Sequence, residues 1–438
     1  MDILSKVTDE MQGVLTQFAD DKAIETEFVK RERKVTGSKF LQALVFGWLD
    51  NPDATLEELT QTGVKVGLDI SPQGLDKRFT KEASQFIYKV LEVVLKVMID
   101  TEPVAIPVLQ RFKGVYLQDT STVVLPDELS NIWQGCGGSS LENTSSSVKL
   151  QFRLDFSCGS LSGQLQSGRD HDRSQKLDKL PSGSLWLRDL GYSSLKEYSE
   201  LNSDGIYHLS KVKSSCGLYD DEGKRWDLVD FLEAHCETEL DTKVYLGFNE
   251  RYECRMLAVQ VLESVSAVRR GKLKSEAKQK GKKVSERSLR LSNWTILCTN
   301  IPSELLTLEE ALTLMRVRWQ IELLFKLWKS EGHIDESRSE SSWRILCELY
   351  AKLIGMVIHH WIMLTGGWQR PNRSIVKISR EIRKHARELA RAFSSGFRER
   401  IYETLEEIQR CLRKVRGVNK RKTKPSAYQL LLDLTGSA

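Results

Sequence analysis

The sequence predicts an α/β protein: a core of mixed strands with flanking helices, an all-helical N-terminal region and a helical C-terminal region. Three patterns predict this class. Apolar residues recur three and four positions apart from Met1 to about Asp100, as on one face of a helix. Alternating strands follow, first at residues 115–156 and again between residues 216 and 300. Helical patterns return after Thr307 and continue to the end. Strands and helices that alternate in this way are typical of α/β folds.

Composition restricts the class of protein but does not identify a partner. The chain has 438 residues, with 65 Lys or Arg against 60 Asp or Glu and a net charge of +5, so a nucleic-acid partner must be argued from where charge lies. No apolar run approaches the roughly 20 residues that span a bilayer, and we expect a cytoplasmic protein without a membrane partner. The eight cysteines stand singly, with no CxxC pair and no Cys/His spacing typical of zinc sites. We interpret them as reduced, mostly structural thiols.

Residues 1–108 form the predicted helical N-terminal domain. Thr55 with Glu58 is a capping box, and Ser71 before Pro72 marks a second helix start. Short helices around residues 67–71 suggest a helix-turn-helix-like unit, and a plain helical bundle is the alternative.

Prolines at positions 103 and 107 end the helical series, and the character of the sequence then changes to strands. VYLQD ends at Asp119, STVVLP follows as a second strand, and SLWLRD ends at Asp189. These strands, with the helices after them, predict a core made of residues 109–215 and 302–372. Residues 216–301 are predicted as a β-rich insertion, and residues 373–438 as a helical, basic C-terminal region.

Two carboxylates at the ends of buried strands predict a cation site. An ionised carboxylate next to a buried strand is costly unless a cation or hydrogen bonds compensate it. Asp119 and Asp189 each end such a strand, and single aspartates elsewhere are usually solvated surface groups. Two carboxylates that leave neighbouring strands at the same end would favour a bound divalent metal.

A helix predicted from Thr307, with Glu310 completing a capping box, to about Ser330 offers a third carboxylate. At about 100° per residue, Arg318, Glu322 and Lys329 share one face. The opposite arc is apolar and would pack on the sheet; it carries Val317, Ile321, Leu323, Leu324, Leu327 and Trp328. The alternative is a surface helix in which Arg318 and Glu322 form an ion pair four residues apart. Phosphoryl transfer on DNA would use three carboxylates to bind two metal ions, and cationic side chains to hold the phosphates.

In these residues the sequence resembles the DDE transposases of bacterial insertion sequences, of the type named insertion sequence four. The resemblance covers most of the chain and rests on a spaced signature: Asp119-Thr120-Ser121, Asp189 before Leu190-Gly191-Tyr192, and the pattern Y-x2-R-x3-E-x6-K. Arg318, Glu322 and Lys329 occupy the last three positions of that pattern, whereas Met315 replaces its tyrosine.

The resemblance implies an RNase H-like core interrupted by the insertion, with Asp119, Asp189 and Glu322 as catalytic metal ligands. It implies two Mg²⁺ ions, for which Mn²⁺ would substitute, and no small-molecule cofactor. Arg318 and Lys329 would hold phosphates. The partners would be double-stranded DNA, both inverted-repeat ends and target, and a second copy of the chain in a synaptic homodimer. Cut-and-paste transposition through a hairpin intermediate is the reaction it suggests.

Further residues are expected to contact DNA, and each of them has an alternative interpretation. Trp294 corresponds to a tryptophan that stacks on a flipped base in relatives, or it is a core aromatic of an alternating strand. Lys211 and Lys213 match basic DNA contacts, or they face solvent at an exposed edge. The stretch from Arg269 to Lys283 has eight basic residues against one acid and is a candidate phosphate-binding segment or only a solvated run. Its first four basic residues are Arg269, Arg270, Lys272 and Lys274.

Two more segments complete the predictions. The basic tail from Arg413 to Lys424 is a second candidate phosphate contact, with the same solvated alternative. His359 and His360 follow an apolar helical run and are predicted to pack within a helix, not to bind metal. Two other functions remain possible from the sequence: a relative that binds DNA without cutting, which Met315 favours, and a structure-selective nuclease without strand joining.

Overall fold

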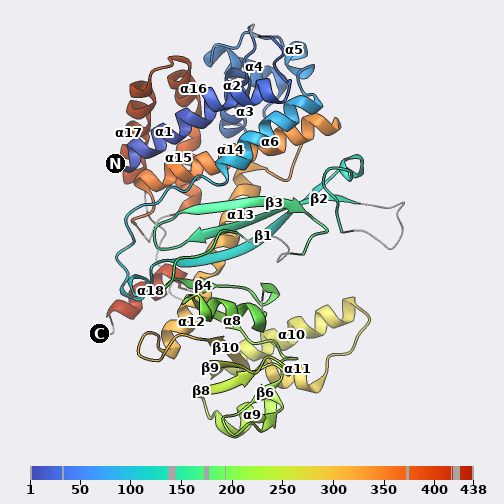
Figure 1. Cartoon of the computed structure of the whole chain (residues 1–438), viewed down its shortest axis with the longest axis vertical. Helices are drawn as coiled ribbons and strands as arrows, with labels where there is room; N and C mark the ends of the chain where they lie inside the picture. The colour runs from blue at the N-terminus through green and yellow to red at the C-terminus, as the bar shows by residue number, and fades with distance from the viewer. Residues whose placement is uncertain are drawn as a thin grey trace. The chain divides into compact units, whose positions relative to one another are not determined.

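The computed structural model describes residues 2–31, 34–136, 145–171, 177–192, 194–370, 374–415, 417 and 425–436 (Figure 1). They group into two compact units. The first comprises Met1–Ala105, Asp119–Leu177 and Gln320–Tyr428, and the second comprises Ile106–Gln118, Asp178–Trp319 and Gln429–Ala438. Mixed strands and many helices confirm the predicted α/β class.

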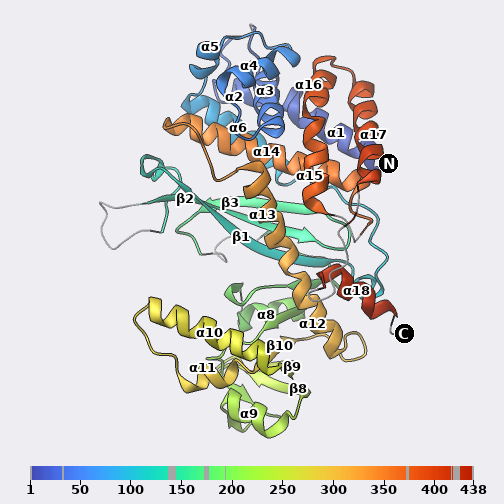
Figure 2. The same cartoon turned by 180° about the vertical axis from the view of Figure 1, so that it is seen from behind.

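A helical layer makes up most of the first unit, and it joins the N-terminal and C-terminal helices of the chain (Figure 2). The central helix α14 packs against α3, α6 and α17, while α16 packs against α3 and α17. The layer consists of α1 (Ile3–Leu15), α2 (Gln17–Glu25), α3 (Gly37–Asp50), α4 (Leu56–Lys65), α5 (Pro72–Asp76), α6 (Lys81–Val94), α14 (Ser342–Gly366), α15 (Ile375–Lys384), α16 (Ala386–Ser394) and α17 (Arg398–Lys414).

The predicted N-terminal segment, residues 1–108, therefore does not stand alone, because α14, α16 and α17 complete its core. Both predicted helix starts are present: Thr55 and Glu58 form the capping box of α4, and Ser71 caps α5 with Pro72 in its first turn. Helix α5 has only 5 residues. Five residues form little more than one helical turn, which is short for a recognition helix. The structure therefore favours the helical-bundle alternative.

Helix α14 is the one helix of the described ranges that is long and apolar enough to cross a membrane. Its most apolar window is completely buried inside the first unit, as expected for the core helix of a helical layer. His359 and His360 are both buried in this helix, in agreement with their predicted packing role. Its ion pair of Glu348 and Lys352, 2.7 Å apart, is also buried.

The strand portion of the first unit consists of the second half of β1 (Val115–Leu125), β2 (Ser146–Asp155) and β3 (Leu161–Ser167), in the order β3-β2-β1. A short 3-10 helix follows β1 at Asp127–Leu129. Helix α13 (Trp319–Gly332) packs on these strands, since the rings of Phe325 and Trp328 lie 6.0 and 4.9 Å from that of Phe152 in β2. The predicted packing of this helix on the sheet is confirmed at Trp328, and Phe325, outside the predicted apolar arc, also packs there.

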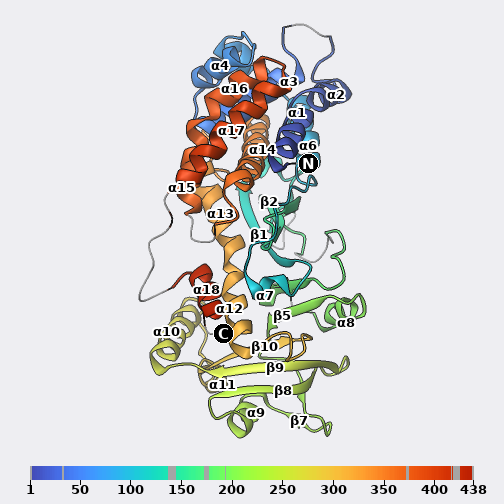
Figure 3. The same ribbon diagram turned by 90° about the vertical axis from the view of Figure 1, so that its left-hand side faces the viewer.

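The second unit contains the first half of β1 and seven further strands in the order β1-β4-β5-β10-β9-β8-β6-β7. Figure 3 labels β5, β7, β8, β9 and β10 of this unit. The pairs β1–β4 and β4–β5 are parallel, and the pairs beyond β5 are antiparallel. The strands are β4 (Leu185–Leu187), β5 (Tyr207–Lys211), β6 (Leu218–Tyr219), β7 (Arg225–Trp226), β8 (Glu239–Leu246), β9 (Tyr252–Gln260) and β10 (Trp294–Thr299). The helices are α7 (Pro107–Gln110), α8 (Leu195–Ser203), α9 (Leu228–His235), α10 (Glu263–Gln279), α11 (Glu286–Leu291) and α12 (Leu308–Val317), with a 3-10 turn at Leu190–Tyr192. Helix α18 spans Ala427–Gly436.

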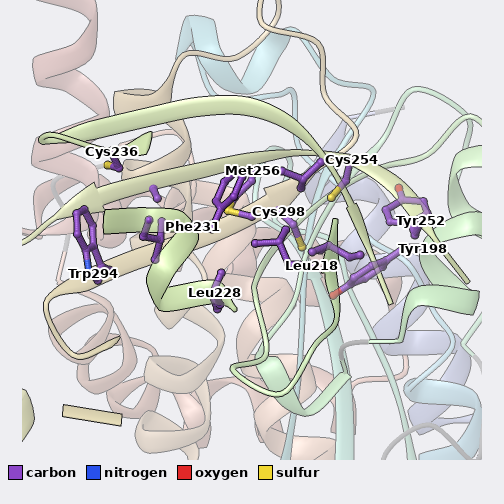
Figure 4. Close-up of a cluster of buried hydrophobic side chains, with 14 of the residues drawn as sticks. Tyr198, Leu218, Leu228, Phe231, Cys236, Tyr252, Cys254, Met256, Trp294 and Cys298 are labelled. Atoms are coloured by element: carbon purple, nitrogen blue, oxygen red, sulfur yellow. The ribbon is translucent and has the colours of Figure 1, made fainter. Parts of the chain in front are cut away.

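The insertion has its own apolar core, to which α8 and β4 of the preceding segment also contribute (Figure 4). Leu218, Phe231, Met256 and Trp294 are among its buried members. The prediction of a β-rich insertion holds for β6 to β10, but helices α9, α10 and α11 lie between those strands. The basic stretch from Arg269 to Lys283 belongs to α10 as far as Gln279, because Leu, Glu, Ala, Lys and Arg side chains favour helix over strand.

Candidate functional site

Asp119 lies within β1, and Asp189 follows β4, the strand that pairs with β1. In the parallel pair of β1 and β4, Leu117 is the register partner of Leu187, and each aspartate follows its leucine by two residues. The paired residues end at these two leucines, so the meeting of the two acids at one site stays a prediction.

The surroundings of Asp119 differ from the prediction in one respect. VYLQD and STVVLP are a single strand of 11 residues, so Asp119 lies inside β1 and not at its end. Burial does not alternate through Asp119, Thr120 and Ser121, which are all half buried, and this interruption suggested two separate strands. The Asp119 carboxylate accepts a 2.8 Å hydrogen bond from the backbone N–H of Thr120.

Asp189 follows β4 and lies beside a buried arginine. The guanidinium of Arg318 is 3.7 Å from Oδ1 of Asp189, with the Arg318 side chain 5% exposed and that of Asp189 44% exposed. Both residues belong to the second unit. A cation held next to a carboxylate provides the compensation that a half-buried anion needs. The structure thus brings together the second acid and the arginine of the signature.

Arg318 also marks a break in the predicted long helix. Helix α12 ends at Val317 and α13 begins at Trp319, with Arg318 as the C-cap of α12. The helical backbone angles of Arg318, φ −47° and ψ −34°, explain why periodicity runs through the break without a signal. Met315, in the position of the signature tyrosine, is buried in α12.

Glu322 and Lys329 both lie on α13, in the first unit. Glu322 is half buried in the first turn of the helix, where the positive end of the helix dipole stabilises a carboxylate. The ammonium of Lys329 donates to the backbone carbonyl of Thr122 in β1 at 3.0 Å and lies 3.5 Å from Asp335. Helix α13 is therefore anchored to the strand that carries Asp119, three residues from that carboxylate.

The prediction of an apolar arc on this helix is wrong at one residue. Leu323 is 44% exposed, while the other five apolar residues of that arc are buried. Glu322 and Lys326 lie on a wide polar face of the helix. At 100° per residue, this face also includes Leu323, the residue after Glu322.

Arg188, immediately before Asp189, is a buried arginine that the sequence patterns did not single out. Its side chain is 3% exposed, its guanidinium pairs with Glu197 of α8 at 2.7 Å, and its plane lies 3.4 Å from the Trp186 ring centroid. A buried arginine held by a carboxylate and an aromatic face is stiff. The sequence SLWLRD shows that a charged arginine precedes Asp189. It does not show that the arginine is buried, because a strand of three residues is too short to reveal which side chains alternate between the two faces.

The basic residues of the insertion divide into two groups, one with intramolecular partners and one that is exposed. Arg269 donates to the carbonyl of Trp294 at 2.8 Å and to Thr295 Oγ1 at 2.9 Å, and burial lowers its pKa. Arg270 donates to Asn293 at 2.8 Å and pairs with Glu263. Both guanidinium groups hold α10 against β10 and the loop before it, and their binding to phosphate stays a prediction. Lys272 and Lys274 are exposed farther along α10.

The remaining basic candidates have simpler positions. Lys211 is exposed at the end of β5, and Lys213 lies beyond that strand, so the alternation that placed both on one face does not extend to Lys213. Arg413 and Lys414 end α17. The rest of the predicted basic tail, residue 416 and residues 418–424, lies outside the described residues.

Trp294, the predicted base-stacking residue, is the first residue of β10 and is 7% exposed within the apolar core of the insertion (Figure 4). The structure therefore favours the alternative, a core aromatic. We expect Trp294→Ala to lower the free energy of unfolding by about 3 kcal/mol, because it removes a buried indole and leaves a cavity. Urea denaturation measures this change. Trp319→Ala, at a residue 51% exposed, is the control and should cost less than about 1 kcal/mol; equal losses in both variants would contradict the core role.

The chain is similar to known proteins in structure and in sequence. A solved structure, a piggyBac transposase synaptic complex with hairpin DNA, aligns with 93% of this chain and 85% of its own at 10% identity and a TM-score of 0.44. The chain is 28% identical over 384 residues to the transposase for insertion sequence element IS231B of Bacillus thuringiensis subsp. berliner, across 82% of this chain and 79% of that protein. It is 27% identical over 368 residues to the transposase for IS1151 of Clostridium perfringens, across 78% and 77%. Residues 118–358, more than half of the chain, match the family described as "Transposase DDE domain". The chain therefore belongs to the DDE transposases of insertion sequences.

Proposed function

We propose that this transposase binds the terminal inverted repeats of its own mobile element, cleaves the DNA strands there and joins the freed 3′-hydroxyl to target DNA. The register of β1 and β4, in which Leu117 pairs with Leu187 two residues before each aspartate, is the observation that supports the proposal. Family membership supports it, since Glu322 stands at the glutamate position of the family signature. The catalytic triad of the proposal is Asp119, Asp189 and Glu322, within an RNase H-like core.

The donor set of this triad fits a divalent metal of the magnesium class. All three side chains are carboxylates, which are hard oxygen ligands. Asp189 already stabilises a positive charge, that of the Arg318 guanidinium beside it. Asp119, Asp189 and Glu322 would hold two Mg²⁺ ions, with Mn²⁺ as a substitute. When bound, such ions polarise the scissile phosphate and lower the pKa of water or of a hydroxyl.

The remaining groups of the proposal belong to the chain itself. Arg318, held rigidly by burial, orients a phosphate through its planar pair of donors. Lys329, anchored on the Thr122 carbonyl, supplies a second positive charge near β1. Exposed Lys211, Lys272 and Lys274 bind the DNA backbone outside the site, and their contribution falls with added salt. Two ends must be joined, so we propose a homodimer on DNA.

A strand-transfer assay tests the proposed function. The purified chain is incubated with DNA that carries the two ends of the element, a target plasmid and Mg²⁺, with EDTA as the blank. Integrated product supports transposition. Cleavage without integration would support a nuclease, and a shifted but intact duplex would support a DNA-binding relative; either result would overturn the proposal.

The hairpin step is a finer part of the proposal and needs its own readout. On end-labelled DNA, a nick appears first and a hairpin of the element end follows it, which a denaturing gel separates by size. Linear double-strand breaks without a hairpin species at any time point would sink the hairpin route while leaving transposition itself intact.

A further inference from the structure

Three potential metal ligands meet in the helical layer of the first unit, on helices that carry none of the triad. Glu381 lies on α15, His385 at the junction of α15 and α16, and Cys411 on α17. One ligand atom from each side chain lies within 4.8 Å of the other two, and all three residues are half buried. Figure 2 shows α15, α16 and α17 beside one another.

The imidazole of His385 is held as a metal-binding imidazole usually is. Its Nδ1 lies 2.6 Å from Oε2 of Glu388, and its Nε2 lies 3.9 Å from Oε1 of Glu381. A carboxylate on one ring nitrogen fixes the tautomer and the ring direction, which leaves the other nitrogen as the ligand. The Glu388 carboxylate therefore turns Nε2 toward Glu381.

The backbone positions of these ligands are fixed by packing that needs no metal. Ile382 and Leu389 are fully buried on either side of His385, and Ile408 and Leu412 are fully buried on either side of Cys411. Helices α15 and α17 contact each other directly. A site whose ligands are already gathered by an apolar core loses little conformational entropy on binding.

We propose that Glu381, His385 and Cys411 bind one zinc-class ion, Zn²⁺ or Co²⁺, separate from the catalytic metals. A thiolate, an imidazole and one carboxylate are ligands for zinc, whereas magnesium requires oxygen ligands. At zinc bond lengths, ligand atoms of a tetrahedron lie about 3.4–3.8 Å apart, close to the 3.9 Å between His385 and Glu381. Three protein ligands leave the fourth position to water.

One neighbouring charge must be accommodated. The ammonium of Lys384 lies 2.8 Å from Oε2 of Glu381, the oxygen that does not face His385, and its side chain is 68% exposed. Lys384 can therefore keep its ion pair or turn into solvent while Oε1 binds the metal. Once bound, the ion joins α15 to α17 and stabilises the helical layer of the first unit, a role that does not depend on the catalytic proposal.

A second cluster serves as the competing location. Asp53, His333 and Glu336 also place ligand atoms within 4.8 Å of one another. His333 Nδ1 faces both acids, at 3.0 and 3.8 Å, as an ion-pair network does. This cluster contains no thiol, and the catalytic triad contains none, so a sulfur-specific signal identifies the Cys411 site among the three.

Cobalt titration of the full-length, reduced protein is the test, after EDTA treatment and dialysis. We expect one Co²⁺ per chain to give tetrahedral d–d bands and a thiolate-to-cobalt charge-transfer band, and Zn²⁺ to bleach both. Zn²⁺ should also raise the Tm by about 3 °C in the presence of excess Mg²⁺.

Matched variants make the result decisive. Cys411→Ser should abolish the charge-transfer band, Glu388→Gln should keep the band but weaken Zn²⁺ binding roughly tenfold to a hundredfold, and Cys136→Ser, at an exposed cysteine elsewhere, should change neither. Glu322→Gln should also retain the band. Absence of the band in the wild-type protein, or its persistence in Cys411→Ser with native circular dichroism, would overturn the site.

Discussion

Replacing Glu322 by Gln is expected to reduce cleavage and strand transfer at least about a thousandfold while leaving DNA binding intact. The amide has the shape of the carboxylate but no charge, so it is a poor ligand for a hard cation. Glu322 is half buried in the first turn of α13, and an amide is tolerated there because the dipole effect it loses is worth less than about 1 kcal/mol. Single-turnover cleavage of end-labelled DNA measures the rate.

Glu309→Gln is the matched control, since Glu309 is an exposed glutamate in the first turn of the neighbouring helix α12. It should cleave and integrate DNA at the wild-type rate. If Glu322→Gln retained full activity, or if both variants lost activity equally, the proposed triad would be wrong.

The protein is expected to lose stability steeply below about pH 6.5 because it buries three neutral histidines. Burial lowers the pKa of His208 and His359 to about 3 and that of His360 to about 4. Nearby Arg188 adds to the effect at His208, and His360 with Arg383 adds to it at His359. One ring nitrogen of each, Nδ1 of His208 and His360 and Nε2 of His359, finds no hydrogen-bond partner among the described residues.

The direction follows from proton counts. In the unfolded chain each histidine takes up a proton as the pH falls through about 6.5, whereas in the folded chain each stays neutral until about pH 3 to 4. Between those limits each histidine therefore removes roughly 1.4 kcal/mol of stability per pH unit, and three remove about 4 kcal/mol. Urea denaturation from pH 7.5 to 5 measures the slope.

A single substitution separates this cause from general acid denaturation. His360→Gln removes one of the three protons that the unfolded chain takes up. The glutamine side chain retains a donor for the Gly159 carbonyl, which His360 Nε2 contacts at 2.7 Å. The slope should fall by about one third. His171→Gln, at an exposed histidine, should leave the slope unchanged. A wild-type slope near zero between pH 6 and 5 would contradict the prediction. Hydrogen exchange of peptides from α14 and β5 reports the two units separately.

The sequence was most informative where chemistry and local pattern coincide. Asp119 and Asp189 were predicted as metal ligands because each follows a short apolar run, and each lies two residues beyond a residue of the pair Leu117 and Leu187. Capping boxes at Thr55 and Thr307 were also read correctly, because a cap is a local motif that spans only four residues.

Tertiary effects were beyond the reach of local pattern. The break at Arg318 has helical dihedral angles, so periodicity cannot reveal it. The hydrogen bonds of Arg269 to Trp294 and Thr295 could not be predicted from a run of basic residues. His385 is 26 positions from Cys411 in the sequence, and only packing brings the two side chains together.

The insertion begins and ends on neighbouring strands, which bears on how such proteins diversify. Leu297 of β10 is the register partner of Lys211 of β5, so the chain returns beside the point where it left. A tight turn could bridge that gap, and loss or exchange of the intervening segment would leave the backbone path intact. Tyr198 and Leu201 of α8 oppose complete loss, because the insertion covers them. We therefore expect related elements to differ in length at the outer parts, such as α10 and the β6–β7 hairpin, and to retain the strands at the base.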